Sequence, residues 1–427
     1  MFYNTSSKIV KFIVIFFPIL FLTGSFLTDS ALSVISILYI SNLLFNNKNT
    51  FLNNRLFLLV ILFWFYIILS SFWAANFNKS LISSTGYLRF LLIPFALQYF
   101  LVNKKDTFIA LSKLSFFLIL ILGFDIIYQN YHGTDIFGFP SQMDNVRNSG
   151  FLKELIAGSF ISKIFFVSII FLNLNSIRKN IFIVLYFLFV TFVTYLTGER
   201  MAFILLIFGI LIYVALIKKK IITKILYISL FCLFIFLISI FNPKNTSRML
   251  NQTINQILYG SYNDDGEYTK TTIDKLTRNE RRKKIILDSG WGAHWLTAYE
   301  IFKAHKLFGS GIRSFRFLCD KKEYEINSDS ERGRCTTHPH NFYIEILAEL
   351  GLIGIFLFMA IIVEIFIKIK KNIFLILKDK KSKISLIILI LILWPFATTG
   401  SLFTNYNASF FWFLLSMSIY NLNILKK

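Results

Sequence analysis

Residues 338–367 read HPHNFYIEILAELGLIGIFLFMAIIVEIFI, in which a polar turn leads directly into an apolar run. The apolar run, at about 343–367, is long enough for the ~20 residues that a helix needs to cross a bilayer. The polar turn closes the longest polar segment of the chain, at about 242–342. This stretch therefore places a histidine-rich turn where a water-exposed loop re-enters a membrane as a helix.

The rest of the chain repeats such apolar runs. Of its 427 residues, 56% are hydrophobic and 51 are Phe, which is more apolar surface than a water-soluble domain can bury. About twelve membrane spans is the best interpretation, and ten or eleven stay open because several runs fall short of the ~20 residues of a full crossing. The runs lie at about 9–23, 31–45, 56–72, 81–102, 107–130, 155–173, 180–196, 201–217, 222–240, 343–367, 384–398 and 405–423.

Positive charges orient these spans, because short cytoplasmic loops of membrane proteins are enriched in Lys and Arg. An internal N-terminus puts most cations of the short loops inside. These are Lys48, Arg55, Lys104, Lys105, Arg178, Lys179, Lys218, Lys219, Lys220, Lys224 and the Lys-rich run 368–383. The sequence therefore predicts cytoplasmic termini, nine spans in 1–241, a large external loop in 242–342 and three spans in 343–427.

The predicted fold class is an all-α, polytopic membrane helical bundle. A formal charge of +22 would suggest nucleic-acid binding in a soluble protein. Here most cations lie between apolar spans, so membrane orientation explains them and no nucleic acid is expected. Within the large loop, residues 290–306 have amphipathic helical spacing, and they can lie along the membrane surface with Trp291 and Trp295 at the level of the lipid headgroups.

Two of the three cysteines lie in the large loop. Cys319 and Cys335 are predicted to form a disulfide if that loop faces an oxidising compartment, and two unrelated thiols are the alternative. Cys232 lies inside an apolar span and is typical of a small core residue.

His340 is the first candidate for chemistry, because a histidine can carry or release a proton near neutral pH. The intervening proline disfavours helix at His338 and leaves His340 near the first turn of the next helix. The Asn341 amide can hold a ring nitrogen or a substrate hydroxyl, and Gly351 and Gly354 are predicted to permit close helix packing. The alternative is that both histidines are interfacial loop residues.

Charges close to the membrane form a second group of candidates, since such a charge needs a partner or a function. Arg200 follows Glu199 in a turn on the predicted outer side, where it either serves a function or reaches the lipid headgroups. Glu199 is either its neutralising partner or exposed to solvent. Arg89 lies within the fourth span and needs a partner.

Asp125 and Gln129 are one turn apart near the outer end of the fifth span, so their side chains face the same side. Arg147 lies in the loop that follows. Asp125 and Arg147 can serve phosphate binding or form a structural ion pair, and the sequence favours neither interpretation.

Other chemistry has no support in the sequence. No Walker loop, paired His/Cys metal spacing or Ser-His-Asp arrangement stands out. His294 and His305 are too isolated to indicate zinc. We therefore predict neither a metal nor a cofactor.

Four stretches make the chain resemble the O-antigen ligase and polymerase superfamily of bacterial envelope enzymes. His340-Asn341 with Gly351-x-x-Gly354 is similar to the family signature at the end of its large periplasmic loop. Residues 197–202, TGERMA, resemble the family's Gly-Ser-Arg-type turn. Residues 125–138 with the later RNSGF of 147–151 resemble the loop after its fifth span, and residues 307–315, LFGSGIRSF, resemble its glycine-rich stretch.

The resemblance implies a GT-C-like glycosyltransferase of the bacterial inner membrane with a periplasmic active site. Such an enzyme transfers a glycan from an undecaprenyl-diphosphate carrier to an acceptor hydroxyl, with inversion and without a metal. The acceptor is a sugar of the lipid A-core in ligases and the end sugar of another carrier-linked unit in polymerases. Ligation is the preferred interpretation. A polymerase, a protein O-oligosaccharyltransferase and a flippase for lipid-linked sugars are the alternatives.

The resemblance also implies residue roles. His340 would activate or orient the acceptor hydroxyl, and Arg200 would bind the diphosphate. A further essential Arg usually precedes a Trp in the large loop of the family, but here His294 precedes Trp295. Arg282, Arg313 or Arg316 would supply that Arg instead. The candidates for substrate binding are Arg147, Asn341, Asp125, Gln129, Arg89, His338, Arg313 and Arg316.

Overall fold

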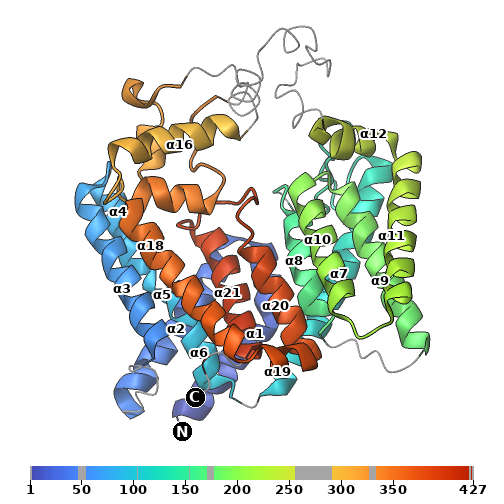
Figure 1. Ribbon diagram of the computed structural model, residues 1–427, viewed down its shortest axis with the longest axis horizontal. Coiled ribbons are helices and arrows are strands. Elements are labelled where there is room, and N and C mark those ends of the chain that lie inside the picture. Colours follow the sequence, from blue (N-terminus) through green and yellow to red (C-terminus); the bar gives the residue numbers. More distant parts are fainter. Residues whose placement is uncertain are drawn as a thin grey trace.

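The computed structural model describes residues 2–46, 54–102, 104–152, 154–170, 177–254, 291–326, 333–422 and 425, and helices dominate all of this part of the chain (Figure 1). The predicted all-α polytopic fold is confirmed. Among the described residues, seven helices are long and apolar enough to cross a membrane. The number of about twelve spans stays a prediction.

The helices coincide with the predicted apolar runs, and the fourth run is divided into three short helices, α4 to α6. Hydrophobic runs of this length fold as helices because a bilayer offers no partner for unpaired backbone groups. The main helices are α1 (Phe2–Thr23), α2 (Ser25–Asn46), α3 (Arg55–Ser70), α4 (Phe77–Gly86), α5 (Leu88–Leu91), α6 (Ile93–Phe100), α7 (Lys105–His132), α8 (Ala157–Ser168), α9 (Ile177–Leu196), α10 (Arg200–Leu216), α11 (Ile221–Phe241), α12 (Pro243–Thr246), α16 (Gly292–Ala304), α17 (Phe315–Leu318), α18 (Phe342–Lys371), α19 (Ile373–Lys378), α20 (Lys380–Ile392) and α21 (Asn405–Asn421).

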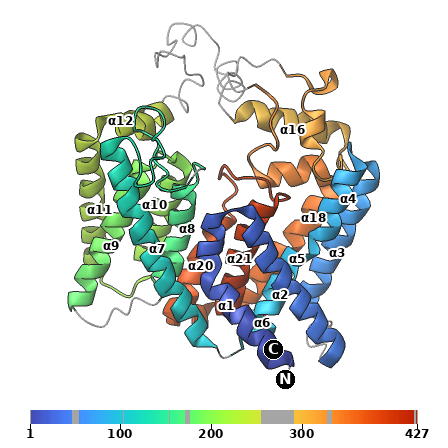
Figure 2. The same ribbon diagram turned by 180° about the vertical axis from the view of Figure 1, so that it is seen from behind.

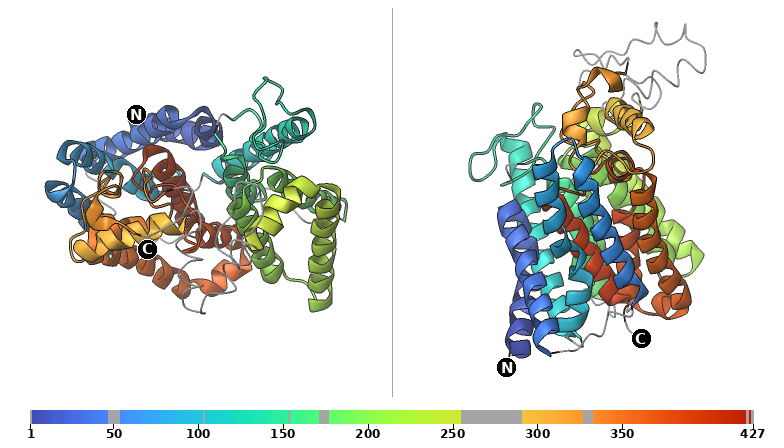
Figure 3. Two further views of the ribbon diagram at one scale, coloured as in Figure 1. Left: turned by 90° about the horizontal axis from the view of Figure 1, so that it is seen from above. Right: turned by 90° about the vertical axis from the view of Figure 1, so that its left-hand side faces the viewer.

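The helices form two groups. Helices α7 to α12 stand on one side, and α1 to α6 with α16 to α21 stand on the other (Figures 1 and 2). Helix α21 lies near the middle when the molecule is seen from above (Figure 3). Aromatic stacking joins the groups there, because the Phe410 ring of α21 stacks with Phe21 of α1 and with Phe160 of α8, at centroid distances of 4.3 and 6.4 Å.

Both chain termini lie at the end of the molecule opposite α16 (Figure 1). This arrangement agrees with the predicted topology, in which the termini share one side of the membrane and the large loop lies on the other. Reporter fusions after Lys219 and Lys380 are expected to read cytoplasmic, because cations of the short loops fix the orientation. A fusion at Tyr268, which lies outside the described residues, is expected to read external. An internal signal at Tyr268 would contradict the orientation and the position of the site.

Helix α18 is broken at Gly351, which has a left-handed backbone (φ 64°, ψ −162°). The break frees backbone groups of the helix to pair with the segment 306–311. Three such hydrogen bonds are Ser310 N to Ala348 O (3.1 Å), Gly311 N to Glu349 O (2.8 Å) and Leu352 N to Lys306 O (2.9 Å). The prediction that Gly351 and Gly354 permit close packing of helices is therefore wrong at Gly351. The absence of a side chain lets an extended segment approach a helix break instead.

Candidate functional site

The turn before α18 gathers aromatic rings around His340. His340 has a left-handed backbone (φ 56°), and its carbonyl accepts a hydrogen bond from the Thr399 amide at 2.9 Å. The ring centroids of Trp291 and His338 each lie 4.2 Å from that of His340, and the His294 ring lies at 5.5 Å. Trp291 and His294 lie at the start of α16, so this helix and the turn form one site.

Asn341 holds this turn in place. Its Oδ1 caps α18 by accepting hydrogen bonds from the amides of Tyr343 and Ile344 at 3.0 and 3.2 Å. Its Nδ2 donates to the carbonyls of Pro395 and Ala397 at 2.7 and 3.3 Å. Both ends of the amide are thus engaged in the fold. A role of Asn341 in holding a ring nitrogen or a substrate hydroxyl stays a prediction.

Two arginines of the glycine-rich segment lie beside this turn. Arg313 donates its amide to the Glu349 carboxylate at 2.7 Å and its Nη1 to the Phe403 carbonyl at 3.1 Å. Arg316 donates its Nη2 to the Thr337 carbonyl at 3.2 Å. Burial lowers the pKa of Arg313, and the charge of Arg316 adds to this effect. Within the described residues, the buried Nε atoms of both arginines have no hydrogen-bond acceptor, which an anionic ligand can supply.

His338 is a buried neighbour of His340. Burial lowers the pKa of His338 to about 4, and the positive charges of Arg316, His294 and Arg313 act in the same direction. Its Nδ1 lies 2.9 Å from the Thr337 hydroxyl. A histidine that stays neutral at pH 7 and binds protons this weakly is better suited to hydrogen bonding than to proton transfer.

Two carboxylates on consecutive turns of α18, those of Glu345 and Glu349, accept hydrogen bonds from the backbone of neighbouring segments. Glu349 accepts hydrogen bonds from the amides of Arg313 and Phe315 at 2.7 and 3.0 Å. Glu345 accepts one from the Leu402 amide at 2.8 Å. Both glutamates are buried. They therefore fix the backbone of the two segments that surround His340, although neither residue was singled out from the sequence.

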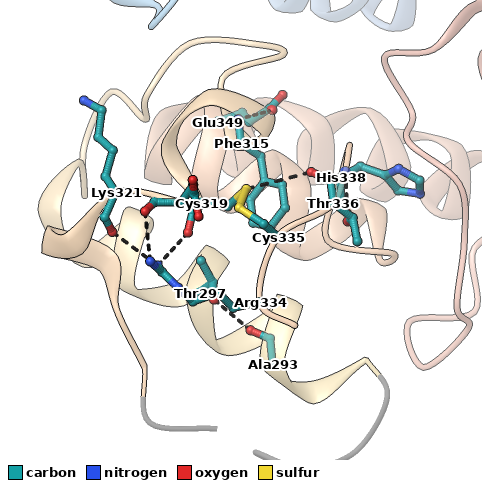
Figure 4. The surroundings of a disulfide bond; sticks show 11 residues. Ala293, Thr297, Phe315, Cys319, Lys321, Arg334, Cys335, Thr336, His338 and Glu349 are labelled. Carbon is teal, nitrogen blue, oxygen red and sulfur yellow. Dashed lines mark hydrogen bonds between the residues drawn. A yellow bond between two sulfur atoms is a disulfide. The ribbon is translucent and has the colours of Figure 1, made fainter. Parts of the chain in front are cut away.

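A disulfide closes the segment that leads to His338 (Figure 4). Cys319 and Cys335 are bonded, with their Cα atoms 5.2 Å apart. Arg334 reinforces the same closure by donating to the carbonyls of Cys319 and Asp320 at 2.6 and 2.9 Å. The described residues 333–338 thereby stay next to α17 and the arginines.

Replacing both cysteines with serine is expected to destabilise this segment by roughly 3 kcal/mol, because the bond removes chain entropy from a loop of about 17 residues. The membrane helices are expected to stay folded. Mass spectrometry of the unreduced protein measures the bond directly. Alkylation of both thiols without reductant would show that no disulfide forms.

A second group of charges surrounds the turn 197–200, at the start of α10. Glu199, the residue before Arg200, is engaged with a neighbouring helix. Its carboxylate caps α8 by accepting hydrogen bonds from the amides of Gly158 and Ser159 at 2.7 and 3.0 Å. Burial raises the pKa of Glu199, while these bonds and the charge of Arg147 oppose the rise.

Three half-buried arginines converge on this turn. Arg200 begins α10, and the side chain of Arg147 lies against Gly198. Arg248, from the segment after α12, donates its Nε to the Gly198 carbonyl at 2.9 Å. Such a group of guanidiniums can bind phosphate oxygens in pairs. Sequence reasoning missed Arg248 because this residue lies 50 residues after Gly198 in the chain.

Asp125 and Gln129 shape the neighbouring loop. Asp125 Oδ1 accepts a hydrogen bond from the Ile136 amide at 3.0 Å. Gln129 Oε1 accepts from the amides of Ser149 and Gly150 at 2.9 and 2.8 Å. Both side chains are buried. Their contacts position the segment that carries Arg147, and a direct role of either residue in substrate binding stays a prediction.

Arg89 has a protein partner. Its Nη2 donates to the Asp29 carboxylate at 3.1 Å, and its Nε forms an ion pair with the same group. Asn405 of α21 donates to Asp29 at 2.9 Å. Arg89 therefore ties α5 to α2 and, through Asp29, to α21. The partner that its position in the fourth span required is therefore Asp29, and a role of Arg89 in substrate binding stays a prediction.

The connection between α20 and α21 contacts both α10, which Arg200 begins, and the turn that carries His340. Trp394, near its start, packs against Phe208 of α10 at a centroid distance of 4.6 Å. Thr399, further along, donates to His340. Both groups lie at the end of the molecule that carries α16 (Figure 1). A substrate that reaches from α10 to α18 would pass along this connection.

Residues 185–359 match the family model of O-antigen ligase. The match confirms the predicted resemblance to an O-antigen ligase-like superfamily. No curated protein matches the chain.

The matched segment, residues 185–359, contains most residues of both groups of charges. Arg200, Arg248, Arg313, Arg316 and His340 all lie within residues 185–359. Arg147 lies before the segment and reaches it through Gly198. Arg282 also falls within the O-antigen ligase segment but lies outside the residues that the structure describes.

Proposed function

We propose that this protein is a membrane glycosyltransferase that transfers a glycan from undecaprenyl diphosphate to an acceptor hydroxyl. The preferred acceptor is a sugar of the lipid A-core, which would make the protein an O-antigen ligase. The proposal rests on one observation above all. His340 packs against His338, on which the charges of Arg313 and Arg316 act. All four residues lie within the segment that matches O-antigen ligase, at one end of a membrane-type helical bundle.

In the proposed reaction, the acceptor oxygen forms a bond to the anomeric carbon while the bond from that carbon to the diphosphate oxygen breaks. Attack from the face opposite the leaving group inverts the anomeric centre. His340 takes the proton of the acceptor hydroxyl, and a positioned base of this kind typically contributes ~10²–10⁴-fold. His338, which is neutral, and the aromatic face of Trp291 orient the acceptor.

The leaving diphosphate gains negative charge as the bond breaks. Arg200, with Arg147 and Arg248, is proposed to stabilise this charge, since cations already aimed at the leaving group need no reorganisation during the reaction. Arg313 and Arg316 are proposed to take the place of the Arg that the family usually carries before a Trp. In this assignment Arg cations, rather than a metal ion, neutralise the diphosphate.

The proposal is tested by deleting the gene and by a transfer assay with purified enzyme. Loss of ligation is expected to leave lipid A-core without its glycan ladder, whereas loss of a polymerase leaves core that carries one repeat unit. Transfer in vitro is expected to survive EDTA. Full loss of activity on chelation would contradict the metal-independent mechanism. An unchanged glycan profile, together with failed transport of lipid-linked sugars, would favour a flippase instead.

A further inference from the structure

A second charged region lies far from His340, at the end of the molecule that carries both termini. Here α9, α10 and α11 enclose an apolar groove of about 650 Å³. Its walls include Phe187 of α9, Val214 of α10 and Phe231 of α11. A volume in the range of ~300–1,000 Å³ is typical of sites for small ligands.

Five lysines line the mouth of this groove, and they come from two separate segments of the sequence, 218–219 and 378–383. Lys218 and Lys219 belong to the connection between α10 and α11, Lys378 ends α19, and Lys380 and Lys383 lie at the start of α20. Residues so far apart in the sequence are brought to one place by the fold. The positive-inside pattern alone requires lysines at this end of the molecule, but not at one groove.

Among the residues that the structure places along the groove, none is Asp or Glu. Lys383 lies close enough to Lys218 and Lys224 for their charges to act on it, and the Asp379 carboxylate acts on it in the opposite direction. The Asp379 carboxylate also accepts hydrogen bonds from the Ser382 amide and hydroxyl, at 2.8 and 2.7 Å. The mouth of the groove therefore carries a net positive charge above an apolar interior.

Helix α11 leaves room for a ligand because it packs thinly. Only Phe231 and Ile238 are buried along its length. Exposed apolar side chains of α11, such as Ile222 and Phe241 at 75% and 78% exposure, are suited to face lipid. An acyl chain in the groove would extend the contact between α11 and its two neighbours.

We propose that the groove binds an anionic glycerophospholipid, with its acyl chains between α10 and α11 and its phosphate at the lysines. Apolar walls with a cationic mouth match the two parts of such a lipid, and lysines near a membrane surface attract anionic headgroups. The bound lipid fastens α11 to the rest of the bundle. This site is separate from the proposed transfer reaction and does not depend on it.

The test is native mass spectrometry of the full-length protein with phosphatidylglycerol or phosphatidylcholine. The wild type is expected to retain phosphatidylglycerol selectively. The triple variant K218Q/K380Q/K383Q is expected to bind it about 10- to 100-fold more weakly. K8Q/K11Q/K371Q is the matched control, because these exposed lysines lie outside the groove, and it is expected to bind as the wild type does.

A second variant, Ile228→Trp, tests the apolar part of the site. Ile228 lines the groove at 36% exposure, so the larger ring is expected to fill it and reduce binding while all lysines remain. Phosphatidylglycerol is also expected to raise the melting temperature of the wild type but not of either groove variant, since a ligand stabilises the state that binds it. Equal binding of both lipids, equal losses in the control, or tighter binding of a polyprenyl phosphate would overturn the proposal.

Discussion

Replacing His340 with alanine or asparagine is expected to abolish glycan transfer while the protein still accumulates in the membrane. Loss of a positioned base typically costs ~10²–10⁴-fold. The asparagine variant is the sharper test, because asparagine tolerates the left-handed backbone at this position and cannot act as a base near neutral pH. Its backbone can keep the hydrogen bond from Thr399.

The measurement is a transfer assay with purified enzyme, combined with donor binding. The His340 variants are expected to bind the lipid-linked donor normally, since His340 is assigned to the acceptor. His305→Ala is a suitable control, because His305 ends α16 and contacts Tyr324 at 3.1 Å. Near-normal transfer by His340→Asn would show that His340 does not act as the base.

Arg200→Ala is expected to abolish transfer for a different reason, which is weakened binding of the diphosphate. Arg200→Lys is expected to stay badly impaired, because an ammonium retains the charge but loses the planar pair of donors. Lys163→Gln is a useful comparison, since Lys163 lies near Glu199 on the neighbouring α8. Full activity of Arg200→Lys would indicate that charge alone suffices.

Hydrophobic runs predicted the helices well, because helix formation in a bilayer depends mainly on local composition and length. The partners of the charged residues within these helices were harder to predict. The position of Arg89 within an apolar span indicated that it needs a counter-charge. Its partner, Asp29, lies 60 residues earlier in the chain, so no local pattern connects the two. Glu345 and Glu349 left a signal in the sequence, namely two carboxylates one turn apart inside an apolar run. Their partners lie in loops that no periodicity connects to α18.

The role of Gly351 also could not be predicted from the sequence. Two glycines three residues apart in an apolar run usually indicate close helix packing. Here Gly351 breaks the helix, and the segment 306–311 pairs with the groups that the break frees. Two stretches that resembled the family separately, 307–315 and 340–354, thus form one structural unit. Only the three-dimensional contact shows that these two stretches are joined.

Gly351→Ala is expected to be the most damaging change of a single small residue in this unit. A left-handed backbone costs a non-glycine residue about 1–2 kcal/mol. A Cβ atom at Gly351 would also collide with the Leu307 carbonyl and the Gly309 amide, and overpacking typically adds ~1–3 kcal/mol. We expect a loss of at least ~3 kcal/mol, measured as a large fall in melting temperature of the purified protein.

Gly333→Ala separates these two causes, because Gly333 has the same φ of 64° but no atom within 4 Å of an added Cβ. It is expected to lower stability only by the backbone cost of about 1–2 kcal/mol and to keep transfer activity. Gly351→Ala is expected to lose activity even where folded protein remains, since displacing 306–311 moves Arg313 away from the Glu349 carboxylate. Equal melting temperatures for the two variants would mean that backbone conformation alone explains the glycine. In that case the pairing of 306–311 with α18 would not be what holds the arginines beside His340.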